Sequence, residues 1–160
     1  MEIKITKTQN PAPKPTDESK LGFGKVFTDH MFLYDWDDVN GWHDARIVPF
    51  GSIELHPAAT VFHYALEVFE GLKAYRTAEG HVQLFRPEEN AKRMYNSAER
   101  LGLPPVPVDE FVEAVKTLIS LDKDWCPHSD GCSLYIRPFL IGTDPSVGLQ
   151  CGIRVNDIPK

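Results

Sequence analysis

The sequence predicts an α+β domain, a mostly antiparallel sheet with two helices packed on one face. Short runs of β-branched and aromatic residues alternate with turn residues up to residue 86, which predicts antiparallel strands. Two later segments, 87–101 and 109–124, carry apolar residues at helical spacing. Because these helices follow the hairpins and do not alternate with strands, a doubly wound parallel sheet is not expected.

Length and composition indicate an ordinary globular chain. It has 160 residues, 42% apolar and 25% charged, which fits one domain of usual size. The net charge is -6, and lysines and arginines never cluster in runs longer than two, so we expect no nucleic-acid partner. No run of 18 apolar residues occurs and the N-terminus has no signal-like segment, so we expect no membrane span and a cytoplasmic location.

Cysteines and histidines do not form a metal motif. The three cysteines have no C-x-x-C spacing, which suits reduced thiols. The six histidines are scattered along the chain. We therefore expect no metal site.

The N-terminal part predicts an arm followed by a hairpin. Residues 1–20 hold three prolines among polar residues, so we expect a flexible or draped arm without chemistry. An apolar and aromatic run extends from Leu21 to Trp36, residues 37–41 form a turn, and residues 46–50 form a short return strand.

The next stretch predicts a second hairpin. A short helical turn around Tyr64 leads into a strand near Gly71. Residues 77–80 form the loop, with Gly80 in the left-handed conformation, and residues 81–86 alternate as a strand.

The first long helix begins at Pro87, which suits a first helical turn, and ends before Gly102. A stripe of hydrogen-bond donors lies well off its apolar face. Two interpretations of this stripe are open: a solvated surface, or a wall that faces an anionic ligand. Its members are Asn90, Arg93, Ser97 and Arg100.

The second helix begins with Asp109 as N-cap, ends near Asp124 and serves packing. A loop at 125–132 leads to a strand at 133–141. Alternation along that strand places Tyr135 and Arg137 together on the face opposite the core.

Pro138 within this last strand favours an edge position, because proline donates no ladder hydrogen bond. Leu134, Ile136 and Leu140 should face the core. The strand has two open interpretations: an ordinary edge strand whose arginine covers apolar surface, or one wall of a binding site.

Four blocks of the chain, 23–31, 63–73, 85–94 and 133–149, resemble the branched-chain amino acid aminotransferases, pyridoxal-phosphate enzymes of fold type IV. The resemblance extends over about residues 21–149. It implies the small N-terminal domain of a homodimeric enzyme that moves an amino group between leucine, isoleucine or valine and 2-oxoglutarate. D-amino acid aminotransferases and aminodeoxychorismate lyases share this fold, but the aromatic residues Phe23 and Tyr135 together with the loop at 142–146 favour the branched-chain group.

The resemblance also implies roles for single residues. Arg93 is similar to the residue that holds the cofactor phosphate, and a guanidinium suits this because it pairs bidentately with phosphate oxygens. Arg137 is similar to the cation that admits the distal carboxylate of glutamate. Tyr64 resembles the phenol that reaches into the partner subunit's site.

Five further positions complete the implied substrate site. Phe23, Phe69 and Tyr135 resemble the aromatic wall of an apolar side-chain pocket. Val147 and Leu149 fall in a loop that also crosses the dimer interface in the family.

The chain also departs from the family. The lysine that forms the Schiff base, and the glutamate beside the pyridine nitrogen, belong to a second domain in these enzymes, and we assign no lysine of this chain that role. Residues 150–160 do not continue the family pattern, so we expect an unrelated tail, from a truncated or frameshifted reading frame, and a chain inactive alone. The alternative is a non-catalytic remnant or interaction module that keeps the small-domain fold.

Overall fold

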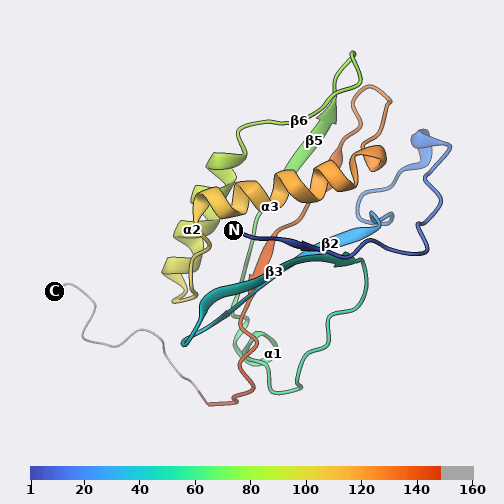
Figure 1. Cartoon of the computed structure of the whole chain (residues 1–160). Coiled ribbons are helices and arrows are strands. Elements are labelled where there is room, and N and C mark those ends of the chain that lie inside the picture. Colours follow the sequence, from blue (N-terminus) through green and yellow to red (C-terminus); the bar gives the residue numbers. More distant parts are fainter. Residues whose placement is uncertain (149–160) are drawn as a thin grey trace.

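The computed structural model describes residues 1–148 and confirms the α+β class (Figure 1). The strands form three small sheets, with the orders β1-β3-β2, β4-β8 and β6-β5-β7, where one sheet was expected. In chain order the elements are β1 (Lys4–Ile5), the 3-10 turn η1 (Glu18–Lys20), β2 (His30–Asp37), β3 (Gly41–Pro49), α1 (Thr60–Tyr64), β4 (Glu67–Phe69), β5 (Leu72–Arg76), β6 (Val82–Leu84), α2 (Pro87–Arg100), α3 (Val108–Leu121), the 3-10 turn η2 (Lys123–Trp125), β7 (Leu134–Ile136) and β8 (Phe139–Ile141).

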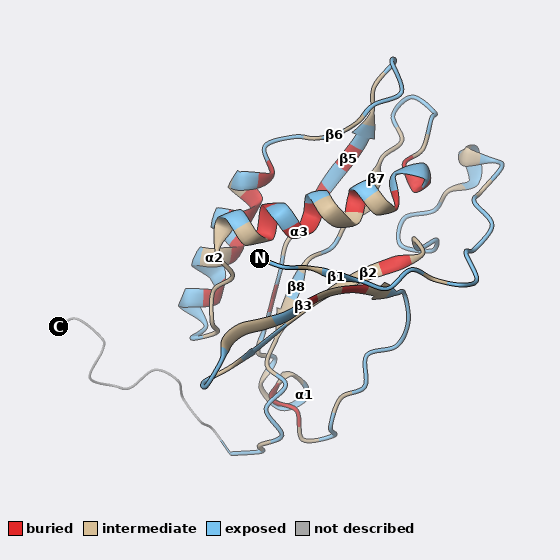
Figure 2. Ribbon diagram, viewed as in Figure 1, coloured by how far each residue is buried: buried red, intermediate tan, exposed pale blue. Residues whose placement is uncertain are grey.

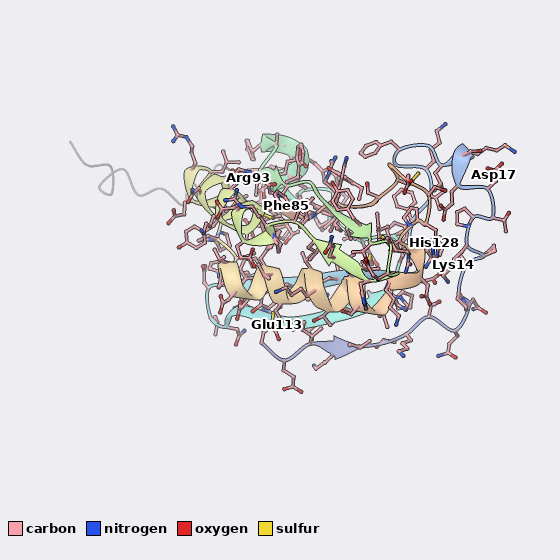
Figure 3. The ribbon with its side chains drawn as sticks, turned by 90° about the horizontal axis from the view of Figure 1, so that it is seen from above. Lys14, Asp17, Phe85, Arg93, Glu113 and His128 are labelled. Atoms are coloured by element: carbon pink, nitrogen blue, oxygen red, sulfur yellow. The ribbon has the colours of Figure 1, made fainter. Side chains whose placement is uncertain are left out.

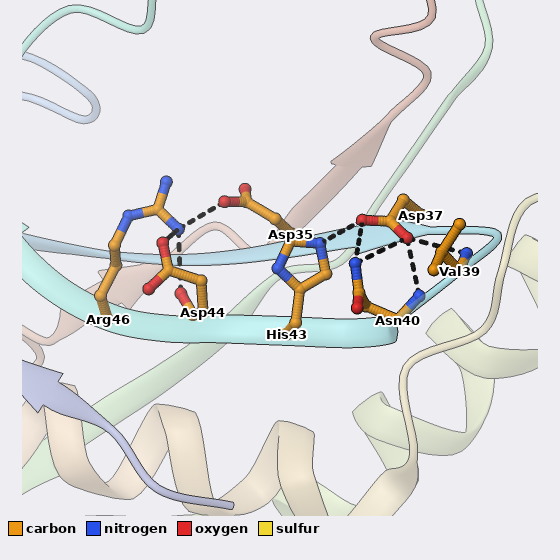
Figure 4. Close-up of polar contacts among 7 residues, drawn as sticks. All are labelled: Asp35, Asp37, Val39, Asn40, His43, Asp44 and Arg46. Carbon is orange, nitrogen blue, oxygen red and sulfur yellow. Dashed lines mark hydrogen bonds and ion pairs between the residues drawn. The ribbon is translucent and has the colours of Figure 1, made fainter.

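The first hairpin pairs β2 with β3 in antiparallel register. Its turn is closed by Asp37, whose carboxylate accepts hydrogen bonds from the backbone N–H groups of Val39 at 2.8 Å and Asn40 at 2.7 Å (Figure 4). Hydrogen bonds from the Asn40 side chain and backbone lower the pKa of Asp37 to about 2. The prediction that the first strand starts at Leu21 is wrong, because the ladder begins at His30 and Gly24 has a left-handed φ of 70°.

Strands β4 and β5 form one ribbon with β8 and β7. Phe69 is opposite Phe139 and Leu72 is opposite Ile136, so both ladders keep one register across the break between them. At the break the N–H of Glu70 donates to the carbonyl of Pro138 at 2.9 Å. The predicted strand at 133–141 is therefore two strands, and both lie at sheet edges, as the proline indicated.

One face of this ribbon and both long helices make the core. Val68, Leu72 and Ala74 point to the helices and are at most 7% exposed. Figure 2 shows the buried positions of α2, α3 and β5 in the same part of the molecule. As predicted, three residues of β7 and β8 pack against this core: Leu134, Ile136 and Leu140.

The helices agree with the sequence except at the ends of α3. Helix α2 begins at Pro87, as predicted. Helix α3 begins after Pro107, whose fixed φ of -54° leads into the helix, so the prediction of Asp109 as N-cap is wrong. It ends at Leu121, before the predicted end, because Asp122 leaves the helical geometry and bonds to His30.

Residues 1–20 lie along the domain. Strand β1 pairs with β3 in parallel, and the N–H of Thr8 donates to Nε2 of His30 at 3.0 Å. Lys14, Asp17 and His128 lie at one end of the molecule (Figure 3). The assignment of 1–20 as a separate arm remains a prediction, and the predicted tail at 150–160 lies outside the described residues.

Within residues 1–148, no helix has both the length and the apolar character needed to cross a membrane. The same residues bring no three histidine, cysteine or acidic side chains into a metal-binding arrangement.

Candidate functional site

The ribbon face that points away from the helices carries Phe69, Tyr135 and Arg137. Nε of Arg137 donates a hydrogen bond to the Tyr135 hydroxyl at 3.0 Å. Its guanidinium also lies over the Phe69 ring, 4.5 Å from the centroid, and 5.2 Å from that of Tyr135. This confirms that Tyr135 and Arg137 project side by side.

Phe23 joins them from the loop before β2. Its ring meets Tyr135 edge-on, with the centroids 4.9 Å apart. Phe23 is 75% exposed and Phe69 59%, so their rings meet solvent over most of their area. We call Phe23, Phe69, Tyr135 and Arg137 the aromatic cluster; it combines apolar surface with one cation at its edge.

The close approach of Tyr135 to the ribbon depends on Gly71. A Cβ atom at Gly71 would lie 2.3 Å from the Tyr135 hydroxyl oxygen, much closer than atoms can approach. Any side chain at this position would therefore force the Tyr135 ring to shift; the backbone itself does not demand glycine, since Gly71 does not have a positive φ.

Arg93 lies on α2 (Figure 3), and it contacts the ribbon at Glu70, the residue before this glycine. Its Nε and Nη2 donate to the two carboxylate oxygens of Glu70, both at 2.9 Å. Nδ2 of Asn90 donates to Glu70 at 2.9 Å and to the carbonyl of Gly71 at 3.1 Å. Burial raises the pKa of Glu70, but the hydrogen bonds from Arg93 and Asn90 and the charge of Arg93 outweigh it, so the net pKa is lowered.

Arg93 and Arg137 approach the ribbon from different sides, so the structure does not bring the donor stripe of α2 and the Tyr135/Arg137 strand together as two walls of one cleft. By strand alternation, Glu70 points to the same side of the ribbon as the buried Val68. Arg137 points to the other side, together with the exposed Phe69. Arg137 lies over the ring of Phe69 and Arg93 bonds to Glu70, so these two contacted residues are neighbours in the chain. Two adjoining hollows of about 460 Å³ each lie between β6 and α3, and neither is lined by a predicted site residue.

The remaining predicted positions lie around the end of α1. The Tyr64 hydroxyl donates to the backbone carbonyl of Val147, whose side chain is 66% exposed. The described residues give neither of them a contact with the aromatic cluster. Leu149 lies outside the described residues.

The donor set at Arg93 fits a phosphate. A guanidinium has five N–H donors, and Glu70 accepts from one edge of it. Among residues 1–148 no acceptor contacts Nη1, and the side chain is 59% exposed, so the second edge is available to an anion.

Sequence reasoning missed Glu70 and Gly71 as parts of the site. Asn90 was predicted to belong to the donor stripe. It is only 9% exposed, and it donates hydrogen bonds to Glu70 and Gly71. The available signal was the spacing of Asn90 and Arg93 by three positions, which places both on one helix face, together with the Glu-Gly pair that directly follows Phe69.

Several known aminotransferases are similar to this chain, although no family profile matches it. Branched-chain-amino-acid transaminase 1 of Bacillus subtilis (strain 168) is 50% identical over 148 residues, 92% of this chain and 41% of that protein. A branched-chain aminotransferase from the archaeon Thermoproteus uzoniensis, solved with norvaline, superposes with a TM-score of 0.55 at 26% identity over 66% of this chain and 33% of its own. The branched-chain amino acid aminotransferase from Escherichia coli gives a TM-score of 0.53 at 28% identity over 65% of this chain and 33% of its own.

The fold is therefore that of the N-terminal domain of the fold type IV aminotransferases. Within that class, the chain is homologous to the N-terminal part of the branched-chain aminotransferases. It spans about two-fifths of the length of the B. subtilis relative, given the 41% covered.

Proposed function

We propose that this chain provides the N-terminal part of a branched-chain amino acid aminotransferase, which transfers the amino group between leucine, isoleucine or valine and 2-oxoglutarate. The observation that carries the proposal is the aromatic cluster, where Phe23, Phe69 and Tyr135 surround a single guanidinium. The homology to enzymes named for this activity supports it.

This combination suits a site that accepts two kinds of side chain in turn. An aliphatic side chain gains from burial against the three aromatic rings, which exclude water from it. The 2-oxoglutarate and glutamate pair carries a distal carboxylate, which the edge of the cluster receives at Arg137.

The cofactor in this proposal is pyridoxal 5'-phosphate. When bound, it supplies the electron sink for amino transfer. Arg93 binds its phosphate through the guanidinium edge that Glu70 leaves open. Tyr64, Val147 and Leu149 complete the substrate site of the second subunit in a homodimer.

The lysine of the reaction comes from polypeptide beyond these 160 residues. Covalent catalysis by a lysine amine is essential for this chemistry, so the 160-residue chain alone should not transfer amino groups. The homodimer and the cytoplasmic location remain predictions, which sedimentation and cell fractionation test.

A chimera tests the proposal. Residues 1–148 joined to the remaining part of the B. subtilis relative should transfer amino groups from leucine to 2-oxoglutarate. In this chimera Arg93→Ala should weaken cofactor binding by about 1.5 to 3 kcal/mol, the range for hydrogen bonds to charged groups. Lys92→Ala is the matched control, because Lys92 is a neighbouring cation on α2 that pairs with Glu89.

Two outcomes would contradict the proposal. Cofactor affinity that stays unchanged in Arg93→Ala would remove Arg93 from the phosphate site. A folded chimera without amino transfer would favour the alternative, a non-catalytic module that keeps the small-domain fold.

A further inference from the structure

Glu70 is the less exposed of the two charged residues in a network with Arg93 and Asn90, and the assigned roles leave it unexplained. Its side chain is 12% exposed, and it lies in the two-residue break between β4 and β5. Its oxygens accept from Nε and Nη2 of Arg93, from Nδ2 of Asn90 and, at 3.3 Å, from the N–H of Gly71. The carboxylate is therefore held from the helix and from the ribbon at once.

The Arg93 side chain, unlike that of Glu70, is mostly exposed to solvent. Its exposed fraction is 59%, and an exposed arginine loses about 2 kcal/mol of rotamer entropy when it is fixed in one conformation. Parallel hydrogen bonds from one edge of the guanidinium to Glu70 fix its plane and direction. The adjacent edge, formed by Nη1 and the second hydrogen of Nη2, then has a defined orientation before any anion arrives.

We propose that Glu70 is a positioning residue for anion binding at this site: it holds one edge of the Arg93 guanidinium so that the other edge is presented to a phosphate. This rests on the proposed function, in which Arg93 binds the cofactor phosphate. It adds that affinity for phosphate depends on a carboxylate, a group that would otherwise repel it.

The sign of one substitution separates positioning from charge. Glu70→Gln removes a negative charge beside Arg93, so a purely electrostatic role predicts tighter phosphate binding. Positioning predicts the reverse, because apparent affinity falls with the fraction of molecules in the binding-competent conformation. If Arg93 is correctly placed in about one molecule in ten without Glu70, binding weakens about tenfold.

The control substitution is Glu89→Gln. Glu89 lies in the first turn of α2 and its charge also acts on Arg93, but it makes no hydrogen bond to that guanidinium. It changes charge by the same amount without changing how Arg93 is held. Phosphate affinity should stay equal or rise slightly in this variant.

The experiment uses the complete 160-residue chain, with inorganic phosphate and pyridoxal 5'-phosphate as probes. In ¹⁵N spectra the Arg93 Nε–H signal, assigned through Arg93→Met, should be protected from exchange in the wild type and lose protection in Glu70→Gln. Titration of either probe should shift this signal, with about tenfold weaker binding in Glu70→Gln.

Equal or tighter binding in Glu70→Gln, or a signal equally protected in both proteins, would overturn the positioning role. So would a wild-type chain that binds neither probe. Failure of the proposed function has a different signature: Arg93→Met would then bind phosphate as well as the wild type. If Arg93→Met binds weakly and Glu70→Gln binds normally, only the positioning role fails.

Discussion

The guanidinium carbon of Arg137 lies 4.5 Å from the centroid of the Phe69 ring; Phe69 ends β4, and Arg137 lies in the break between β7 and β8. A cation over an aromatic face is attracted by the ring quadrupole, and at an exposed site this contributes about 0.5 to 1 kcal/mol. The Phe69 ring and the Tyr135 hydroxyl therefore orient the Arg137 guanidinium while contributing little to stability, which suits the ligand-binding role proposed for it.

Arg137→Met separates the contribution of Arg137 to stability from its contribution to ligand binding. The variant should lose at most about 1 kcal/mol of unfolding free energy, measured in urea. In the chimera it should lower kcat/KM for glutamate much more than for leucine, because only glutamate carries a distal carboxylate. Arg100→Met, at the end of α2, is the control. Equal losses for both substrates would assign Arg137 a general structural role.

Gly71→Ala should displace the Tyr135 ring within the aromatic cluster. The new Cβ would lie 2.3 Å from the Tyr135 hydroxyl, so the ring must move and its hydrogen bond with Arg137 must lengthen. We expect a loss of about 1 kcal/mol in unfolding free energy, the lower end of the range for overpacking, because the displaced atom is the end of a partly exposed side chain.

Tyr135→Phe supplies the internal control for this clash. It removes the nearest atom, so alanine at position 71 should cost less in the Tyr135→Phe background than in the wild type. Gly51→Ala is the neutral reference, since its Cβ would meet only a carbonyl oxygen at 4.0 Å. If the costs of Gly71→Ala and Tyr135→Phe were additive, the Tyr135 hydroxyl would not be the atom that alanine at position 71 displaces.

The sequence predicted best the features that depend on local chemistry. The start of α2 at Pro87 and the turn at Gly80, with a φ of 85°, follow from the backbone preferences of proline and glycine. The pairing of Tyr135 with Arg137 follows from strand alternation alone.

Features that depend on distant contacts were not predictable. Asp122 leaves α3 to bond with His30, 92 positions away, and nothing near either residue indicates it. The contact of Glu70 with Arg93 also required knowing which ribbon face meets α2. The sequence also did not indicate that the backbone carbonyl of Val147 accepts a hydrogen bond from Tyr64.

Removal of Asp122 should destabilise the domain strongly. Its carboxylate is 3% exposed and accepts from the His30 backbone N–H at 3.1 Å, with His30 Nδ1 at 2.7 Å. Asp122→Ala leaves these two groups buried without partners, at about 1 to 3 kcal/mol each, so we expect about 2 to 6 kcal/mol in total.

The control is the exposed pair of His43 and Asp37, with side chains 36% and 44% exposed. His43→Ala should change the unfolding free energy by about 0.5 kcal/mol or less, because exposed ion pairs contribute little. Similar costs for Asp122→Ala and His43→Ala would contradict the importance of burial.

Tyr34 should make stability fall at alkaline pH. Burial, followed by the hydrogen bond to Glu110, raises its pKa to about 12. Between about pH 10 and 12 the unfolded chain releases this proton and the folded chain keeps it, so unfolding free energy decreases as pH rises. Tyr34→Phe should remove this part of the pH dependence, and the exposed Tyr75→Phe should not. Parallel wild-type and Tyr34→Phe profiles would contradict it.

Lys73 is the lysine that best tests the expectation that the reactive amine lies outside these residues. It is exposed, lies opposite Tyr135 in the ladder and shares the face of the aromatic cluster. Because we assign the reactive lysine to polypeptide outside this chain, borohydride reduction in the presence of pyridoxal 5'-phosphate should label Lys73 no faster than other exposed lysines, as read by peptide mass spectrometry. Lys73→Arg should then lower total labelling only by the share of one surface lysine. Stoichiometric labelling at Lys73 that depends on Arg93 would instead place a complete cofactor site within this chain.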